Sequence, residues 1–376
     1  MRHLACLALS ALLVSCSSLG SSATGLSGSL VIAGGGMSSR SLEVREAFLA
    51  RRLSGEVGVI GAASSGPEAS AARGARAMNE AAGAEVAVAL PFNAGEPELA
   101  DDPALAAKID GCGALWFTGG SQSRIVEAMR PGGRETLAWR ACVRLLERGG
   151  VIGGSSAGAA MMCDPMIRRG RSANAMRAGV GPEGVDLGAG MGFFPWGIVD
   201  QHFLERGRFG RLVVALGETG IRLGWGISED SAIVVDRTTG WAEVIGSSGL
   251  ALFDMRELQV SEGRWEGVGL SLLSSGDRVN ALTGEVVATS GSTARAPLGE
   301  PERALVMEGL FNAEALKQAV HQLFDTHRER ALLRDGAEGA LLRRGANARA
   351  WVRQGASGAE QMSAAGLRLD LYRITE

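Results

Sequence analysis

The chain has 376 residues, of which 46% are apolar and 21% charged, and its formal net charge is −3. This length fits one large α/β domain with an appendage, or two modest domains, and the composition is typical of a globular protein with a buried core. The near-neutral charge and the single tyrosine, Tyr372, argue against a basic or aromatic platform for nucleic acid.

The N-terminus predicts a bacterial lipoprotein signal. Arg2 and His3 precede the apolar run LACLALSALLV, which is too short to span a bilayer but has the length of a signal-peptide core. The run ends in Leu-Val-Ser-Cys16, which resembles a lipobox, so we expect removal of residues 1–15 and a lipid on Cys16. Residues 16–28 are a Ser/Gly-rich tether. The sequence therefore predicts export and anchoring in the cell envelope, and an ordinary cleaved signal with an incidental cysteine is the alternative.

From residue 29 onward, strand and helix patterns alternate. The apolar runs SLVIAGGG, VGVIGAASS, AEVAVALPF, ALWFTGG and GGVIGGSSAGA each end in small residues, which is typical of buried strands followed by turns. Alanine-rich segments such as EASAARGARAMNEAAG lie between them and have helical spacing. This alternation predicts a mostly parallel sheet with helices on both faces, and ligands in such sheets bind at the carboxyl ends of the strands.

The later part of the chain predicts more strands and an appendage. WGISEDSAIVVD, WAEVIGSSGLALFD and GLSLLSSGDRV are strand-like, and residues 289–303 form a polar linker. Beyond it, residues 304–376 make a C-terminal extension with one helix, which Asn312 can cap, and a closing strand, LRLDLYRI. The apolar stripe of the helix consists of Leu316, Val320, Leu323 and Phe324.

Cysteine usage predicts neither disulfides nor a metal site. Three cysteines, Cys112, Cys142 and Cys163, remain beyond the signal region, and their number and spacing fit buried small apolar side chains better than a disulfide framework or zinc ligands. No ligand cluster for a metal or nucleotide is evident, so we expect no cofactor.

The segment Gly154-Ser-Ser156-Ala-Gly158 matches the G-x-S-x-G motif, directly after the strand VIGG and before the small-residue run AAMM. In this strand–turn–helix context the central serine is exposed as a nucleophile, and the amide of Ala157 faces the developing oxyanion. The loop FTGGSQ, which includes Gly120 and Gln122, follows another strand and offers a second oxyanion donor and a substrate contact. A Gly/Ser-rich turn and an ordinary loop are the structural alternatives.

A serine nucleophile needs a base, and histidine has a suitable pKa. Beyond the signal the sequence has only His202, His321 and His327. The last two fall in the C-terminal helical region, where solvated roles are expected. His202 follows the apolar run GFFPWGIV and lies among polar residues, so it is the preferred base.

The third member of a triad is an acid that orients the imidazole. Glu229 and Asp230 both end a glycine-rich turn before SAIVVD, and the residues alone do not choose between them. The resulting chain order is Ser, His, acid. The α/β-hydrolase order of Ser, acid, His would instead need His321 or His327 as the base.

Three arginines follow His202 in the segment ERGRFGRL, namely Arg206, Arg208 and Arg211. Guanidinium groups beside a candidate base suit bidentate recognition of carboxylates. A solvated helix face paired with Glu205 is the alternative.

These stretches together resemble the cyanophycinase family, whose relatives include the aspartyl dipeptidases. The matching pieces are FTGGSQSRI, GGSSAGAAM, DQHFLERGRFGRL, GISEDSAIVV and LSLLSSGDRV, in the family's order. The likeness spans about residues 29–288, which we expect to be the catalytic domain. It implies a flavodoxin-like fold similar to the class I glutamine amidotransferases, a three-layer sandwich here followed by an α+β extension.

The resemblance implies that Ser156 is the nucleophile, His202 the base and Glu229 the orienting acid. It also implies substrate contacts from Gln122, Asp200, Gln201, Arg206, Arg208 and Arg211. Family members release β-aspartyl-arginine dipeptides from cyanophycin, a polyaspartate backbone with arginine on each β-carboxyl. The sequence departs from the family at Ser121 and Ser228, where aspartate is usual, and the loss of charge at Ser121 puts the substrate in question.

The expected activity is therefore hydrolysis of cyanophycin or related β-aspartyl peptides through an acyl-enzyme. Two rival readings are an envelope esterase that uses Ser156 and a lipoprotein that binds peptides without catalysis. The expected partners are an aspartate- and arginine-bearing peptide or polymer and the membrane through Cys16. The oligomeric state stays open, with a homodimer as one option.

Overall fold

The computed structural model describes residues 26–38, 41–295, 305–312, 314–326, 328–355 and 358–373. The predicted signal peptide, Cys16, most of the tether and His327 lie outside these residues.

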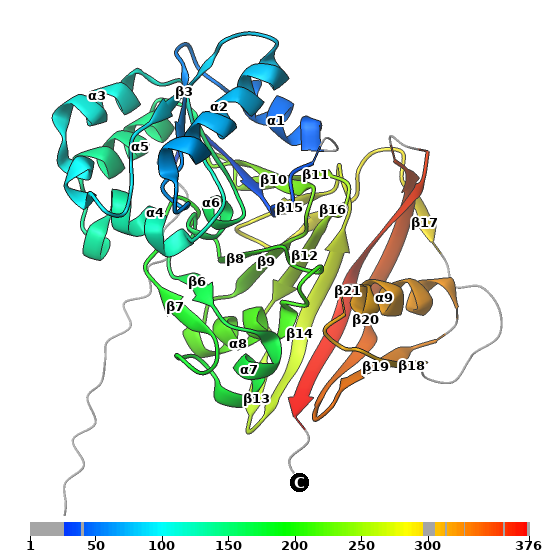
Figure 1. The fold of residues 1–376 in the computed structure, drawn as a ribbon. Coiled ribbons are helices and arrows are strands. Elements are labelled where there is room, and N and C mark those ends of the chain that lie inside the picture. The colour runs from blue at the N-terminus through cyan, green and yellow to red at the C-terminus, as the bar shows by residue number, and fades with distance from the viewer. Residues whose placement is uncertain are drawn as a thin grey trace, which may run out of the picture.

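A nine-stranded sheet occupies the upper part of Figure 1, in the order β16-β15-β11-β10-β1-β5-β4-β2-β3. The parallel strands are β1 (Ser29–Ala33), β5 (Val151–Ser155), β4 (Ala114–Phe117), β2 (Val57–Ile60) and β3 (Ala87–Leu90). Antiparallel strands continue the sheet beyond β1: β10 (Ser231–Asp236), β11 (Trp241–Gly246), β15 (Arg278–Asn280) and β16 (Val286–Val287). Every residue of β2 and β4 is buried, which explains their uninterrupted apolar sequence.

Alternate side chains of these strands face two helical layers. One apolar cluster joins Val31, Val59 and Trp116 to helices α1 (Leu42–Leu49) and α2 (Pro67–Ala82). The opposite faces of the same strands pack against α3 (Pro103–Gly111), α4 (Gln122–Met129) and α5 (Leu137–Glu147), with the short 3₁₀ helices η2 (Pro97–Asp101) and η3 (Pro131–Gly133) between them. This arrangement confirms the predicted α/β sandwich with helices on both faces of a parallel sheet.

A second, ten-stranded sheet lies beside the first. Its main path is β18 (Leu305–Glu308), β19 (Arg330–Asp335), β20 (Glu338–Gln354), β21 (Glu360–Arg373), β14 (Arg264–Leu273), β12 (Leu250–Asp254), β9 (Leu223–Ile227) and β8 (Ile198–Gln201). Two short strands, β13 (Gln259–Ser261) and β17 (Thr293–Arg295), pair with β14 and β20. Helices α7 (Ser172–Ala178) and α8 (Phe209–Thr219) and the small sheet of β6 (Met166–Arg169) and β7 (Asp186–Gly188) complete this half.

The C-terminal extension is continuous with this second sheet. Strand β21 pairs antiparallel with β14, so the extension and residues 264–273 share one set of backbone hydrogen bonds. Part of the predicted linker forms β17. Helix α9 (Ala315–Asp325) begins after Glu314, so the prediction that Asn312 caps it is wrong: Asn312 Oδ1 accepts a hydrogen bond from the Glu314 amide, before the helix starts. Its predicted apolar stripe is buried, as expected.

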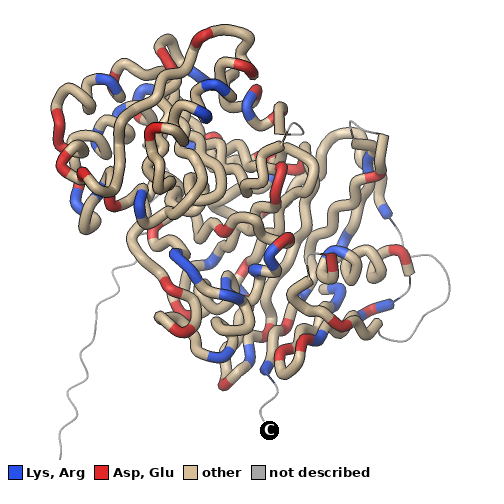
Figure 2. Tube along the Cα trace, in the orientation of Figure 1, with Lys and Arg blue, Asp and Glu red and all other residues tan. Residues whose placement is uncertain are grey.

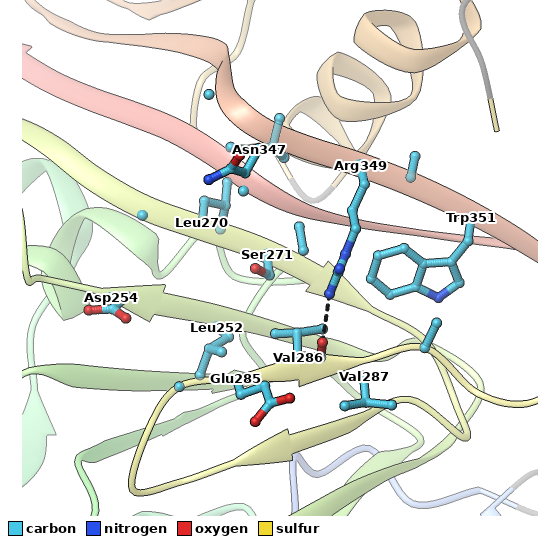
Figure 3. Close-up of a pocket in the computed structure, with 18 of the residues that line it drawn as sticks. Leu252, Asp254, Leu270, Ser271, Glu285, Val286, Val287, Asn347, Arg349 and Trp351 are labelled. Atoms are coloured by element: carbon cyan, nitrogen blue, oxygen red, sulfur yellow. Dashed lines mark hydrogen bonds between the residues drawn. The ribbon is translucent and has the colours of Figure 1, made fainter. Parts of the chain in front are cut away.

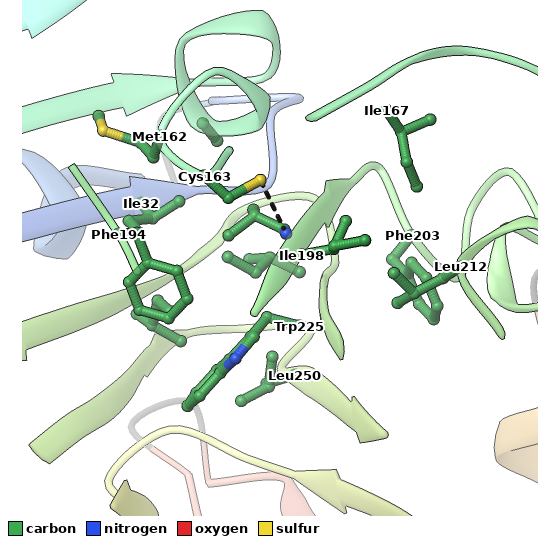
Figure 4. Close-up of a cluster of buried hydrophobic side chains, with 14 of the residues drawn as sticks. Ile32, Met162, Cys163, Ile167, Phe194, Ile198, Phe203, Leu212, Trp225 and Leu250 are labelled. Atoms are coloured by element: carbon green, nitrogen blue, oxygen red, sulfur yellow. Dashed lines mark hydrogen bonds between the residues drawn. The ribbon is translucent and has the colours of Figure 1, made fainter. Parts of the chain in front are cut away.

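A shared core fills the junction between the two sheets (Figure 4). Ile32 of the first sheet and Trp225 of the second belong to the same cluster, together with Phe194 and Ile198. The sulfur of Cys163 lies in it and accepts a hydrogen bond from the backbone of Val199. The three described cysteines are buried and free, as the sequence predicts, and burial raises the pKa of Cys163 to about 12.

Basic and acidic residues are mixed over the molecule in Figure 2, and no stripe of one sign is seen in that view. Among the described helices, none is both long and apolar enough to cross a bilayer.

Candidate active site

Ser156 lies on a sharp turn between β5 and α6 (Ala157–Ala160), with φ 57° and ψ −111°. The flanking glycines are required by packing. A Cβ on Gly154 would lie 2.4 Å from the carbonyl oxygen of Gly158, and a Cβ on Gly158 would lie 2.3 Å from that of Phe117. The strand–turn–helix context that the G-x-S-x-G motif predicts is therefore present, and it exposes Ser156 at the carboxyl end of the parallel strands.

His202 follows β8 and directs its ring at this serine. Its Nε2 is 2.7 Å from Ser156 Oγ, and its Nδ1 is 2.5 Å from Glu229 Oε1. A carboxylate that accepts from Nδ1–H leaves the lone pair of Nε2 free to accept the serine proton. His202 is only 7% exposed, so the imidazole at the centre of these hydrogen bonds is largely shielded from water. The three side chains that the sequence singled out are brought together.

The triad is assembled from two sheets. Ser156 follows a strand of the first sheet, His202 follows a strand of the second, and Glu229 lies where the chain crosses from β9 in the second sheet to β10 in the first. The site therefore depends on how the sheets are joined.

The backbone at the end of β1 connects the two sheets at the site. The sequence did not predict this role. Three consecutive carbonyls at the end of β1 accept the amides of three site segments: Ala33 from Ser156 (3.0 Å), Gly34 from His202 (2.8 Å) and Gly35 from Asp230 (3.0 Å). The three residues whose amides are held in this way, Ser156, His202 and Asp230, have positive φ values of 57°, 47° and 52°. In the described part of the chain they are the non-glycine residues with positive φ. Such strained positions persist only where surrounding contacts determine them. The signal in the sequence was the run of three glycines after the first strand.

Gly35 and Gly36 also cover the triad. A Cβ on Gly35, whose φ is +109°, would lie 2.4 Å from Cε1 of His202. A Cβ on Gly36, whose φ is +58°, would lie 2.5 Å from Oε2 of Glu229. Both positions need glycine, because a side chain would displace a member of the triad.

The geometry separates the two candidate acids. Glu229 contacts His202, whereas the carboxylate of Asp230 accepts hydrogen bonds from the Ser38 amide and hydroxyl at 2.9 and 2.8 Å and from the Ser41 hydroxyl at 2.5 Å. Asp230 thus fastens the segment after β1, and Glu229 is the residue placed to orient the imidazole.

The predicted oxyanion donors lie on either side of the serine. Ala157 is the first residue of α6, where backbone amides have no acceptor within the helix. In the opposite loop, Gly119 faces Ser156: a Cβ there would lie 3.3 Å from Ser156 Cβ and 3.7 Å from its Oγ. Gly120, the residue predicted from the sequence, follows Gly119 in this loop and packs closely on the carbonyl of Ala63.

Most of the predicted substrate contacts are already engaged within the protein. Arg211 and Asp200 are 4% and 1% exposed and form a bidentate pair, with Nε and Nη2 at 2.7 and 2.5 Å from the carboxylate. Arg208 donates to the carbonyl and side-chain oxygens of Gln201, at 2.6 and 2.5 Å, and to Asp200 at 3.2 Å. Burial lowers the pKa of Arg208 to about 10. Arg206, by contrast, is exposed.

Gln122 is buried as well, and its Nε2 donates to the carbonyls of Ile167 and Arg168 at 2.6 and 2.8 Å. It therefore joins α4 to β6. Of the two departures from the family, Ser121 precedes α4 and is partly exposed, whereas Ser228 is fully buried and its hydroxyl has no hydrogen-bond partner in the described part of the chain.

Electrostatics favour a neutral imidazole at the site. Burial lowers the pKa of His202, and the hydrogen bond that its Nδ1–H donates to Glu229 acts in the opposite direction. The positive charges of Arg206 and Arg208 lower this pKa further. A neutral imidazole is the form that can take a proton from serine.

A cavity of about 1200 Å³ lies away from the triad, between the edge of the first sheet and the face of the second (Figure 3). Its arginines are already engaged. Arg349 stacks on Trp351 and donates to the carbonyl of Val286, and Arg256 and Arg368 pair with Asp254 and Glu257. None of the predicted site residues lines this cavity.

The fold and the Ser–His–Glu geometry define a protein of the α/β class with a serine elbow. No family model matches the chain, but individual known proteins do. It is 34% identical to the cyanophycinases of Trichormus variabilis and Nostoc sp. over 194 residues, or 49% of this chain and 62% of each relative. It is 28% identical to the cyanophycinase of Synechococcus elongatus over 243 residues, or 62% of this chain and 72% of that one.

The chain is thus a distant homologue of cyanophycinases, and it spans less than two thirds of the length of the first two. Among solved structures, a peptidase from an acI-B1 Actinobacterium matches with a TM-score of 0.52 at 18% identity, covering 68% of this chain and 98% of that chain. At this identity the match concerns the fold.

Proposed function

We propose that the protein is a serine peptidase that hydrolyses cyanophycin or related β-aspartyl peptides to dipeptides of the β-Asp-Arg type. The observation that carries this proposal is the continuous hydrogen-bonded line from Ser156 through His202 to Glu229. The distant homology to cyanophycinases supports the substrate class.

The mechanism is acyl transfer. Ser156 Oγ attacks the backbone carbonyl while Nε2 of His202 accepts its proton, and Glu229 stabilises the imidazolium that forms. The amides of Ala157 and of the 119–120 loop stabilise the oxyanion. The imidazolium then protonates the leaving amine, and a water molecule activated by His202 releases the acyl group. Since Arg208, Arg211, Asp200 and Gln122 are engaged internally, we assign them a positioning role, and we assign the contact with substrate to Arg206, which is exposed.

The test is incubation of the purified protein with cyanophycin and with β-aspartyl-arginine oligomers, followed by mass spectrometry of the products. Dipeptide release by the wild-type protein and its loss in Ser156→Ala support the proposal. Cleavage of simple esters without cleavage of β-linked peptides would instead identify an esterase. Binding of peptides without reaction with a fluorophosphonate would identify a non-catalytic binding protein.

The place of action is part of the proposal. Cyanophycin is an intracellular store, whereas Cys16 predicts export, so we propose that the protein scavenges released polymer or β-aspartyl peptides at the envelope. Growth with a labelled fatty acid should label the wild-type protein and leave Cys16→Ala unlabelled and unanchored. Label retained in Cys16→Ala would refute the lipid anchor.

A further inference from the structure

The C-terminal extension contacts the loop that carries the predicted base. Gly207, five residues after His202, packs so closely on the carbonyl of Phe311 that a Cβ there would lie 2.2 Å from its oxygen. The rings of Phe311 and Phe209 are also in contact, with centroids 5.5 Å apart. Phe311 lies four residues before the first residue of α9, so this packing places the extension against the His202 loop close to where α9 begins.

A cavity of about 290 Å³ lies between α9 and the catalytic region. Leu204, two residues after His202, forms one wall, and Ser247 and Ser248 of the β11–β12 loop form another. Both serines are tied to the Glu229 turn, because the Ser247 amide donates to the Asp230 carbonyl at 3.0 Å and the Ser248 amide donates to the Ser231 hydroxyl at 2.7 Å. The cavity therefore adjoins the segments that carry two members of the triad.

Helix α9 contributes Lys317 and His321 to the opposite wall. Four residues apart, they lie on one face of the helix. Within the described part of the chain, Lys317 forms no ion pair and the imidazole of His321 forms no hydrogen bond. Burial lowers the pKa of His321, with Asp325 acting in the opposite direction, so its ring is a neutral donor at neutral pH.

The acidic groups near these two residues are engaged. Glu360, which also lines the cavity, is 3.4 Å from Nη1 of Arg295, and Asp325 is 2.6 Å from Nη2 of the same arginine. Arg295 is thus shared between two carboxylates, whereas Lys317, which is exposed, has no ion-pair partner in the described part of the chain. An ammonium and an imidazole N–H on one wall, facing an apolar surface that includes Leu204, suit a carboxylate on a short aliphatic stem.

We propose that Lys317 and His321 form a carboxylate-binding subsite through which the C-terminal extension recognises acidic side chains of the peptide substrate. This inference rests on the proposed peptidase function and adds a role for residues 305–373, which lie beyond the family resemblance. The extension thereby selects peptides that carry a carboxylate beyond the bond that is cleaved.

Binding to the full chain with Ser156→Ala tests the subsite without requiring turnover. The probe is fluorescein-labelled tetra-aspartate with an amidated C-terminus, followed by fluorescence anisotropy. Lys317→Met keeps the aliphatic stem and should weaken binding about tenfold, because it removes a charge-assisted hydrogen bond. His321→Leu should weaken it severalfold. Lys108→Met is a matched control: it is the only other lysine in the sequence, lies exposed on α3, and should leave binding unchanged.

Three outcomes overturn the subsite: Lys317→Met binds as tightly as the parent, Lys108→Met weakens binding equally, or tetra-asparagine binds as well as tetra-aspartate. A probe with a free C-terminus that binds when the amidated one does not would assign the subsite to a terminal carboxylate instead of a side chain. In the active protein, Lys317→Met should raise KM for acidic peptides and leave kcat unchanged. Absence of any peptide hydrolysis by the wild type would refute the proposed function, while the binding measurements would still decide the subsite.

Discussion

The carbonyl oxygen of Gly34 accepts the backbone amide of His202 at 2.8 Å, and this bond joins the end of β1 in the first sheet to the end of β8 in the second. Its neighbours, Ala33 and Gly35, hold the amides of Ser156 and Asp230 in the same way. One short stretch of backbone thereby sets the relative positions of a nucleophile, a base and the turn that carries the acid. The geometry of the site depends on this stretch as much as on the triad side chains.

Ser156→Ala should lower peptide hydrolysis by about 10⁶-fold, because no other nucleophile replaces the hydroxyl. It should also abolish labelling by a fluorophosphonate, with an unchanged thermal unfolding temperature. Ser155→Ala changes the preceding serine of the same motif and should retain labelling. Turnover that survives in Ser156→Ala would remove the serine from the mechanism.

Glu229→Gln and Asp230→Asn should have opposite signatures. Glu229→Gln should lower kcat by about 10⁴-fold with little loss of stability, since the amide no longer holds the correct tautomer of His202. Asp230→Asn weakens the contacts with Ser38 and Ser41 and should cost about 1–3 kcal/mol of unfolding free energy. Denaturant unfolding and steady-state kinetics on both variants distinguish the roles, and a kinetic defect confined to Asp230→Asn would reverse the assignment.

The pH dependence of kcat/KM should show a base with a pKa below the ordinary value of about 6.5. Burial disfavours the imidazolium of His202, so the neutral, active form persists as the pH falls below that value. Activity should therefore rise with pH and reach its plateau in the acidic range. Glu229→Gln removes the contribution that raises this pKa, so the residual activity should rise at a still lower pH. If the rise of kcat/KM in Glu229→Gln instead moved toward higher pH, Glu229 would not be the group that raises the pKa of His202.

Gly35→Ala should impair the site more than the fold. The added methyl would overlap the His202 imidazole, so fluorophosphonate labelling should fall at least tenfold while a folded protein remains. Gly83→Ala is the matched control, because Gly83 also has positive φ, at +63°, but nothing within 4 Å of an added Cβ. It should cost about 1–2 kcal/mol of stability and leave labelling intact. Equal labelling in the two variants would show that His202 tolerates the methyl group.

Arg211→Met and Arg206→Met should separate structural from substrate-binding arginines. Arg211→Met removes the bidentate partner of the buried Asp200 carboxylate, which keeps Arg208 at 3.2 Å, and should destabilise the fold by about 1–3 kcal/mol. Arg206→Met changes an exposed side chain, so unfolding should be unaffected while KM for arginine- and aspartate-bearing peptides rises. Chemical denaturation and peptide kinetics on the two proteins provide the comparison. A stable Arg211→Met protein with a raised KM would return Arg211 to the substrate groove.

Local sequence patterns predicted much of the fold. The parallel strands are continuous apolar runs because both of their faces are buried, and the serine elbow is recognisable because Gly154 and Gly158 must be small for strand and helix to approach. The prediction that Asn312 caps α9, which was made from local sequence alone, is wrong. The Asn312 side chain accepts from the amide of Glu314, two residues on, and the helix starts later.

The sequence by itself determined the strand–helix alternation, the serine on its turn and, through the family resemblance, the histidine and acid that accompany it. Only the tertiary structure decided that these residues come from two sheets and that β21 of the C-terminal extension pairs with β14. It also decided that Arg211 forms a buried ion pair with Asp200. The physical reason is range. Helix and strand patterns depend on neighbours a few residues away, whereas strand pairing, buried ion pairs and the carbonyls that hold the triad join segments tens to hundreds of residues apart, and they form only when shared apolar faces are buried together.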